Sequence, residues 1–222
     1  MTLINPFCAV RPNDSISNNF SSKSFELYDK EEIKDILKTN PHSILQIIKD
    51  NIYPRKKLSN SKRFENVKKN YRRFKSKGLL IKDQKPGFYI QELNVNSKTY
   101  NGIVAKVNLN DYKIGRIKKH EKTLNSRELV FKKYLKKTRF NADAVLLIYR
   151  NKKAISDFIK DTKKQAPTSV ISISDNEIVK LWYIVEDFQI KKITKAFESV
   201  QNLYIADGHH RTASSLLLSD EE

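Results

Sequence analysis

The sequence predicts an α+β protein in which a mixed sheet carries flanking helices. Two kinds of apolar spacing support this class, because apolar residues three and four positions apart mark helices and short apolar runs mark strands. The two kinds follow one another without the strict alternation of a doubly wound parallel sheet. A chain of 222 residues with 39% hydrophobic and 31% charged residues has the balance of a soluble globular protein. We therefore expect a single domain over residues 1–222.

The first half of the chain holds two clear helix signals among short apolar runs. Asp29 is a good N-cap residue, and Glu31 and Glu32 follow it in the first turn. A longer helix is expected over 61–77, with Gly78 just beyond its end. In order, the expected elements are a strand over 3–10 with a turn at 11–14, a loop over 13–24, a helix over 30–38, a strand over 43–48, the helix over 61–77 with Phe64, Val67, Tyr71 and Phe74 on one face, a hairpin of 79–81 and 88–93, and a strand region over 100–109.

The second half repeats this mixture of helical and extended patterns. The nearly continuous apolar run over 144–149 is typical of a buried central strand. The expected elements are a basic amphipathic helix over 126–137 anchored by Leu129, Val130, Phe131 and Tyr134, the strand over 144–149, a helix over 151–159, paired strands over 170–173 and 178–185, a helix marked by Ile190, Ile193, Phe197 and Val200, a strand over 203–206 and a final helix from 212 to 218.

Composition excludes several classes of protein. Cys8 is the only cysteine, so the chain can form neither an internal disulfide framework nor a cysteine-based zinc site. No apolar run approaches the roughly 20 residues that a membrane helix needs. The residues before Arg11 carry no charge and no cleavage pattern of an export signal. We therefore expect a cytoplasmic protein with no membrane partner.

Two segments carry the whole positive excess of this +18 chain. Residues 55–85 hold 13 basic and 2 acidic residues, and residues 113–139 hold 11 basic and 2 acidic residues. One interpretation is a face that binds nucleic acid or another polyanion. The other is a composition biased toward lysine, because 33 of the 43 basic residues are Lys and phosphate recognition favours Arg. The sequence leaves both interpretations open.

The strongest chemical motif is the segment 204–212, which reads Tyr-Ile-Ala-Asp-Gly-His-His-Arg-Thr. An apolar strand runs into a glycine turn and then into a helix, whose free amides would favour an anion. Arg211 adds a charged fork for phosphate oxygens, and Asp207 could bind magnesium or accept a proton. His209 and His210 could donate to phosphate or act as acid and base. The alternatives are an ordinary capped turn and a metal hydrolase, but the latter needs more ligands than this segment offers.

Two further clusters hold candidate side chains. His120, Glu121 and Thr123 place an imidazole, a carboxylate and a hydroxyl within four residues, which could orient a substrate or a nucleotide. Alone, this cluster fits a solvated basic loop equally well. Glu26 lies in the polar stretch before the first helix, where an exposed glutamate is common.

Together these pieces resemble a bacterial family, the DGHHR proteins labelled domain of unknown function 1015. That family is similar to archaeal free serine kinase and to the fold of ParB and sulfiredoxin. Its members are much longer, so the chain resembles the N-terminal part of a member and is expected to be truncated at its C-terminus. The residues that carry the resemblance are Pro6-Phe7, Arg11-Pro12, Asn40-Pro41, Gly78-Leu79-Leu80, Phe88-Tyr89-Ile90, Gly102-Ile103-Val104-Ala105, Tyr112, Gly115-Arg116-Ile117, His120-Glu121, Thr123 and 204–211.

The resemblance implies a ParB/sulfiredoxin-like nucleotide-binding fold and transfer of phosphate to a small hydroxylated molecule such as free serine. Mg²⁺ and ATP or ADP would be the cofactors. Asp207 would bind the metal and act in catalysis with His209 and Glu26, the last as general base in place of the usual aspartate. The phosphates would be held in a pocket formed by Gly208, His210, Arg211, Thr212, His120, Glu121 and Thr123.

Two other functions remain open from the sequence. The basic segments 55–85 and 113–139 would serve a ParB-like DNA-binding module. A nucleotide-dependent switch without catalysis would use the same phosphate motif but show no turnover.

Overall fold

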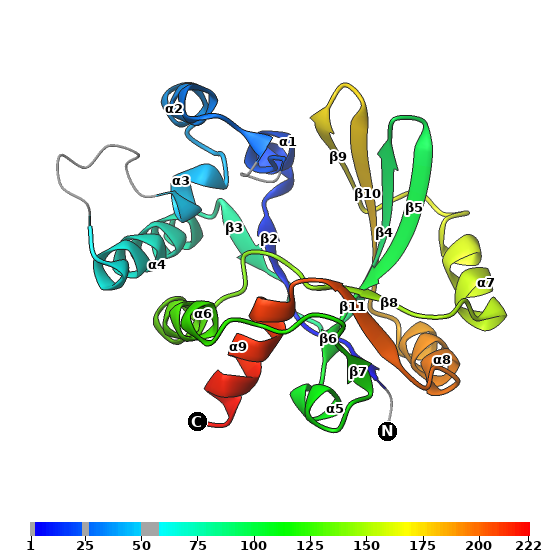
Figure 1. Ribbon diagram of the computed structural model, residues 1–222. Helices are drawn as coiled ribbons and strands as arrows, with labels where there is room; N and C mark the ends of the chain where they lie inside the picture. The colour runs from blue at the N-terminus through cyan, green and yellow to red at the C-terminus, as the bar shows by residue number, and fades with distance from the viewer. Residues whose placement is uncertain (1–2, 24–26, 50–57) are drawn as a thin grey trace.

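A computed structural model describes residues 3–23, 27–49 and 58–222 (Figure 1). The α+β prediction is confirmed, because several small sheets carry flanking helices. The strands are β1 (Ile4–Asn5), β2 (Val10–Pro12), β3 (Leu80–Lys82), β4 (Phe88–Val95), β5 (Lys98–Val104), β6 (Lys106–Val107), β7 (Ile117–Lys118), β8 (Leu146–Ile148), β9 (Ser169–Ser174), β10 (Glu177–Ile184) and β11 (Leu203–Asp207). The helices are α1 (Ser17–Phe20), α2 (Lys30–Thr39), α3 (Leu45–Ile48), α4 (Asn60–Ser76), α5 (Leu109–Lys113), α6 (Asn125–Thr138), α7 (Lys153–Thr162), α8 (Asp187–Glu198) and α9 (His209–Ser219), with a 3₁₀ turn at Asp14–Ile16.

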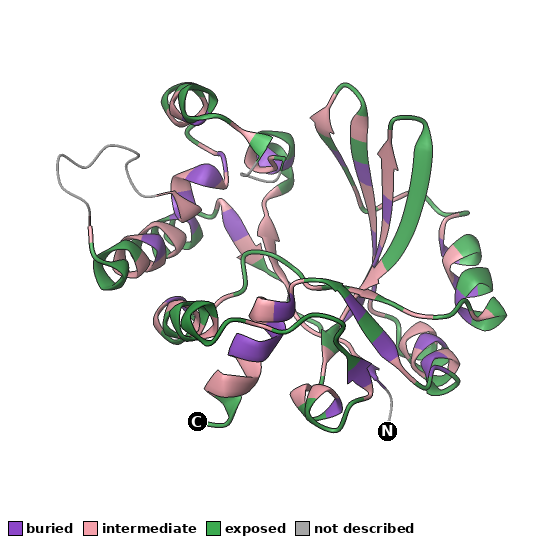
Figure 2. Cartoon of the chain, viewed as in Figure 1, coloured by how far each residue is buried: buried purple, intermediate pink, exposed green. Residues whose placement is uncertain are grey.

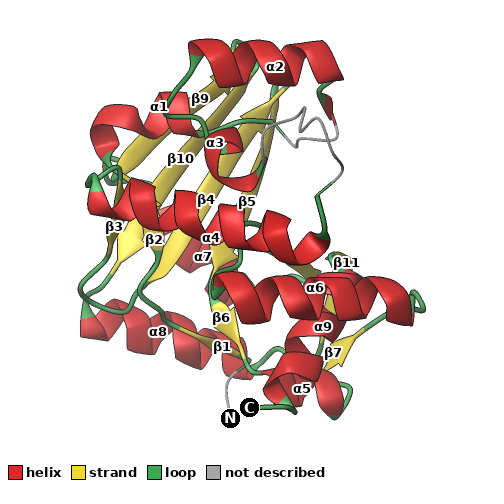
Figure 3. Cartoon of the chain, turned by 90° about the vertical axis from the view of Figure 1, so that its left-hand side faces the viewer, coloured by secondary structure: helices red, strands yellow, loops and turns green. Residues whose placement is uncertain are grey.

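The largest sheet has four antiparallel strands in the order β5-β4-β10-β9. A second sheet has the order β7-β11-β8, in which β11 runs parallel to β7 and antiparallel to β8. Two short antiparallel pairs, β1 with β6 and β2 with β3, join the N-terminal segment to the rest. Helices α1 to α4 lie on one side of the four-stranded sheet, as Figure 3 shows.

The main core joins both larger sheets. Phe88 and Trp182 of the four-stranded sheet, Phe158 of α7, Phe197 of α8 and Ile205 of β11 are all buried in one cluster. A smaller cluster forms where α4 packs with α3 and β3, through Ile47, Val67, Phe74 and Leu80. Strand β11 is therefore anchored in the main core, and it delivers the 204–212 motif to a fixed place.

Several predicted elements are confirmed. Helix α2 begins after Asp29, whose side chain accepts hydrogen bonds from the amides of Glu31 and Glu32, each at 2.8 Å. Helix α4 ends before Gly78, which has a φ of 67°. Strands β9 and β10 form the predicted antiparallel pair, and α8 buries Ile193 and Phe197, with Val200 buried just after the helix ends.

Other expectations are wrong, each because pairing or packing beyond the local pattern decides the structure. The predicted strand over 43–48 is instead helix α3. The Ser43 hydroxyl accepts a hydrogen bond from the Leu45 amide at the start of this helix, and the helix buries Leu45 and Ile47. The predicted hairpin of 79–81 and 88–93 does not form, because β3 pairs with β2 and β4 pairs with β5 and β10. The strand over 3–10 divides into β1 and β2, residues 11–12 belong to β2 rather than a turn, and the loop over 13–24 contains α1.

The two largest differences concern exposed apolar residues. The run over 144–149 is not a central strand: β8 lies at the edge of its sheet, with Leu146 and Ile148 exposed (Figure 2). On α6, Leu129, Val130 and Phe131 are exposed rather than anchoring. Tyr134 does contact α4, with its ring 5.4 Å from that of Phe64 between centroids. Among the described residues, no helix has both the length and the apolar character needed to cross a bilayer.

Candidate functional site

Gly208 forms the turn between β11 and α9. Its φ of 94° lies in the left-handed region, which glycine adopts without the steric cost that a Cβ would bring. A Cβ at this position would lie 3.1 Å from Val145 Cγ2 and 3.3 Å from Arg211 Cζ. The turn therefore needs glycine both for its backbone conformation and for the close approach of these two side chains.

The N-terminus of α9 has no side-chain cap among the described residues. Its first helical hydrogen bond runs from the Thr212 amide to the Gly208 carbonyl at 3.0 Å. The amides of His209, His210 and Arg211 thus precede the hydrogen-bonded ladder. Free amides and the helix dipole make such an end favourable for an anion.

Arg211 lies between two carboxylates. One guanidinium nitrogen, Nη1, is 2.7 Å from Asp143 Oδ2, and it also donates to the Ala144 carbonyl. Nη2 donates to Asp207 Oδ2. Both carboxylates are largely exposed, at 75% and 67% of the side chain. Sequence reasoning missed Asp143, and the only signal for it was an acidic residue just before an apolar run.

His209 joins the loop that holds the second predicted cluster. Its side chain is 5% exposed, and Nδ1 lies 3.6 Å from Glu121 Oε2. The rings of His120 and His209 meet edge to face with centroids 4.5 Å apart. Nε2 of His209 is buried and makes no hydrogen bond to a described residue. The structure thus brings His120, Glu121 and His209 together, although these residues are far apart in the sequence.

The remaining predicted residues make contacts within the protein. His210 Nε2 accepts a hydrogen bond from the Leu124 amide at 3.1 Å. Thr123 donates to Glu128, and Thr212, which is buried, donates to the Gly208 carbonyl at 3.1 Å. The bond between His210 and Leu124 joins the loop before α6 to the start of α9, and the other two bonds fix each segment internally.

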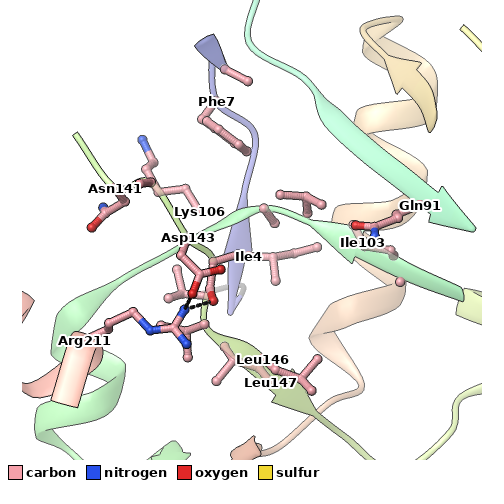
Figure 4. A pocket seen from close by; sticks show the side chains of 18 of the residues that line it. Ile4, Phe7, Gln91, Ile103, Lys106, Asn141, Asp143, Leu146, Leu147 and Arg211 are labelled. Carbon is pink, nitrogen blue, oxygen red and sulfur yellow. Dashed lines mark hydrogen bonds and ion pairs between the residues drawn. The ribbon is translucent and has the colours of Figure 1, made fainter. Parts of the chain in front are cut away.

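A cavity of about 1560 Å³ opens beside Arg211. Figure 4 shows Arg211 and Asp143 at one wall, with apolar side chains of β1, β5 and β8 around them. None of His120, Glu121, Thr123, His209 and His210 lines this cavity. The predicted site is therefore divided: Arg211 faces the cavity, and the histidines join the loop that precedes α6.

The predicted catalytic Glu26 lies outside the described residues, as do residues 55–57 of the first basic segment. Among the described residues, no group of three or more His, Cys, Asp or Glu side chains is arranged to hold a metal ion. In the second basic segment, Lys132 and Lys136 both pair with Glu221 and lower the pKa of that carboxyl to about 2. Lys137 pairs with Glu65. Several positive charges of the second basic segment are therefore already neutralised within the protein.

The family model described as "Protein of unknown function (DUF1015)" matches residues 4–222. Neither a curated protein nor a solved structure matches the chain significantly.

Proposed function

The chain belongs to the DUF1015 family of proteins of unknown function, and from the geometry of the site we propose that it binds the phosphates of ATP or ADP at the N-terminus of α9. We further propose that it transfers the terminal phosphoryl group to a small hydroxylated molecule. The resemblance to archaeal free serine kinase and to the ParB/sulfiredoxin-like fold makes free serine the first acceptor to test.

One observation carries the proposal: an uncapped helix start and an arginine fork lie side by side. The amides of His209, His210 and Arg211 are free of helical partners, and the guanidinium of Arg211 lies at the wall of a cavity. Backbone amides at a helix start and arginine side chains are two groups that recognise phosphate oxygens. Gly208 supports this proposal, because the absence of a Cβ lets the Arg211 guanidinium lie close to the start of the helix.

The donor set near Arg211 fits Mg²⁺ that arrives with a nucleotide, rather than a metal held by protein groups alone. Mg²⁺ commonly binds one or two carboxylates together with substrate phosphates. Asp207 and Asp143 are two such carboxylates, both largely exposed on either side of the guanidinium. A bound Mg²⁺ would neutralise charge on the phosphates.

The transfer assigns different tasks to the side chains. The phosphoryl group passes from the nucleotide to the acceptor oxygen, the hydroxyl proton passes to a carboxylate, and the shortened nucleotide leaves. Arg211 and the α9 amides hold the phosphates in position. Glu26 remains the predicted base. The burial of His209 favours a positioning role for it, in which it holds Glu121 and His120 against the start of α9.

Titration with ATP, ADP and pyrophosphate by calorimetry, with and without Mg²⁺, tests the phosphate site. Arg211→Ala should weaken binding about 10- to 100-fold, since a hydrogen bond to a charged group contributes about 1.5–3 kcal/mol. Arg72→Ala on α4 is the matched control and should leave the affinity unchanged. Equal affinities of the wild type and the Arg211 variant would refute the site, and absence of phosphoserine with either nucleotide would refute serine as the acceptor.

Nucleic-acid binding is the second candidate, and α4 carries the observation that favours it. Lys62 and Lys69 are exposed there and make no ion pair with a described residue, in contrast to the paired lysines of α6. Real phosphate contacts predict a steep loss of DNA affinity between about 50 and 200 mM salt. A flat salt response would exclude this function.

A further inference from the structure

The cavity beside Arg211 is far larger than a small amino acid requires. Its volume is about 1560 Å³, whereas pockets for drug-sized ligands occupy about 300–1000 Å³. Free serine has three carbons and no apolar body, so it would leave most of this space and its walls to water. The size of the cavity therefore points to a larger partner for the proposed phosphate site.

The walls of the cavity are mainly apolar. Ile4 of β1, Ile103 of β5, and Leu146 and Leu147 of β8 are among the apolar residues that line it, and Figure 4 labels all four. Leu146 is 57% exposed although it lies on a strand. Covering such side chains with an apolar ligand is favourable in proportion to the area removed from water.

Basic side chains outnumber carboxylates among the residues that line the cavity. The described residues that line it include one carboxylate, Asp143, and six basic side chains: Lys106, Arg139, Lys160, Lys163, Lys164 and Arg211. Four of these side chains are paired with carboxylates: Lys163 with Glu92, Arg139 with Glu222, Lys164 with Asp161, and Arg211 with Asp143 and Asp207. Lys106 makes no ion pair with a described residue and lies on the wall near Asn141 (Figure 4). An unpaired lysine beside an apolar wall is complementary to an amphiphilic anion.

We propose that the hydroxylated substrate of this site is amphiphilic, with a carboxylate or similar anionic group and an apolar body several carbons long that lies along β8 and β5. This assignment rests on the proposed phosphate site at α9 for the phosphoryl donor. Lys106 contributes to binding the anionic group. The apolar body replaces water over Leu146 and Ile103.

A homologous series of 3-hydroxycarboxylic acids from four to ten carbons tests the proposal, titrated by calorimetry into the full chain in the presence of pyrophosphate. Each added methylene should raise the affinity about two- to fourfold, because a buried methylene contributes about 0.8 kcal/mol at most. L-serine should bind more weakly than the eight- and ten-carbon acids. Lys106→Ala should weaken all members of the series by the same factor.

Leu146→Asp should flatten the dependence on chain length, and because Leu146 is exposed this change should leave the fold intact. Val170→Asp is the matched control: Val170 is 49% exposed on β9, also an edge strand, and does not line the cavity. That variant should keep the full chain-length dependence. Circular dichroism and urea unfolding of both variants would confirm that they fold.

The outcomes separate this inference from the proposed function. Pyrophosphate binding that depends on Arg211, together with a flat chain-length series, would overturn the amphiphilic substrate and leave the phosphate site standing. A steep series that Leu146→Asp abolishes, without pyrophosphate binding, would support the cavity and refute the phosphate site. A flat series with a dimer that Leu146→Asp dissociates in sedimentation would assign the apolar wall to a second copy of the chain and overturn the inference.

Discussion

Replacing Gly208 by alanine would test the turn that places the start of α9 beside Arg211. A left-handed backbone costs a non-glycine residue about 1–2 kcal/mol. The new Cβ would lie 3.1 Å from Val145 Cγ2 and 3.3 Å from Arg211 Cζ, so one of these groups must move. Overpacking of this kind typically costs about 1–3 kcal/mol. We therefore expect Gly208→Ala to lower the free energy of unfolding by about 2–5 kcal/mol, measured by urea denaturation.

Gly115→Ala separates the two contributions. Gly115 has a φ of 81°, but a Cβ there would meet nothing within 4 Å, so it should show only the backbone cost of about 1–2 kcal/mol. The excess loss in Gly208→Ala then measures the contact with Val145 and Arg211. Gly208→Ala should also weaken pyrophosphate binding, because the new Cβ displaces the Arg211 guanidinium. Equal losses in the two variants, with unchanged pyrophosphate affinity, would refute the close approach on which the site depends.

Two further predictions concern stability. Hydrogen bonds from Lys163, from Asn94 and, less strongly, from Lys180 lower the pKa of Glu92 to about 2. The ionised carboxylate therefore stabilises the fold above the ordinary pKa of 4.5, and this stabilisation is lost as the pH falls toward 2. Glu92→Gln should therefore cost about 1–3 kcal/mol at pH 7 and much less near pH 2 in urea unfolding, and a pH-independent difference would contradict this. His210→Ala should lose about 0.5–1.5 kcal/mol and speed hydrogen exchange at the Leu124 amide, whereas unchanged exchange would show that this bond is not formed.

Local chemistry made part of the fold predictable. Asp29 caps α2 through bonds to residues two and three positions later, so the sequence holds all the partners within one turn. The turn at Gly208 was predictable for the same reason, because the strand, the glycine and the helix follow one another directly in the sequence. The prediction erred only in where α9 begins: the structure starts it at His209, so the histidines and Arg211 belong to its first turn.

Partners distant in the sequence explain what could not be predicted. An apolar run such as 144–149 has the same pattern at the centre and at the edge of a sheet. It lies at the edge here because β8 pairs with a single strand, β11. Asp143 reaches Arg211 from a loop that no motif marks. The contact of His209 with Glu121 likewise depends on the parallel pairing of β7 and β11, which brings the two loops together.

The position of Arg211 between Asp143 and Asp207 sets a condition on any phosphate that binds there. Ion pairs with exposed carboxylates contribute only about 0–1 kcal/mol each, so a phosphate can replace them at small cost. The exchange still favours the phosphate, because a hydrogen bond between charged groups contributes about 1.5–3 kcal/mol. The free amides at the start of α9, which no side chain of the described residues caps, add to this gain. The released carboxylates then lie beside the phosphate, where Mg²⁺ would satisfy them. In the proposed site the glycine, helix start, arginine and aspartates would act as one unit, so a change in any of them should alter phosphate affinity.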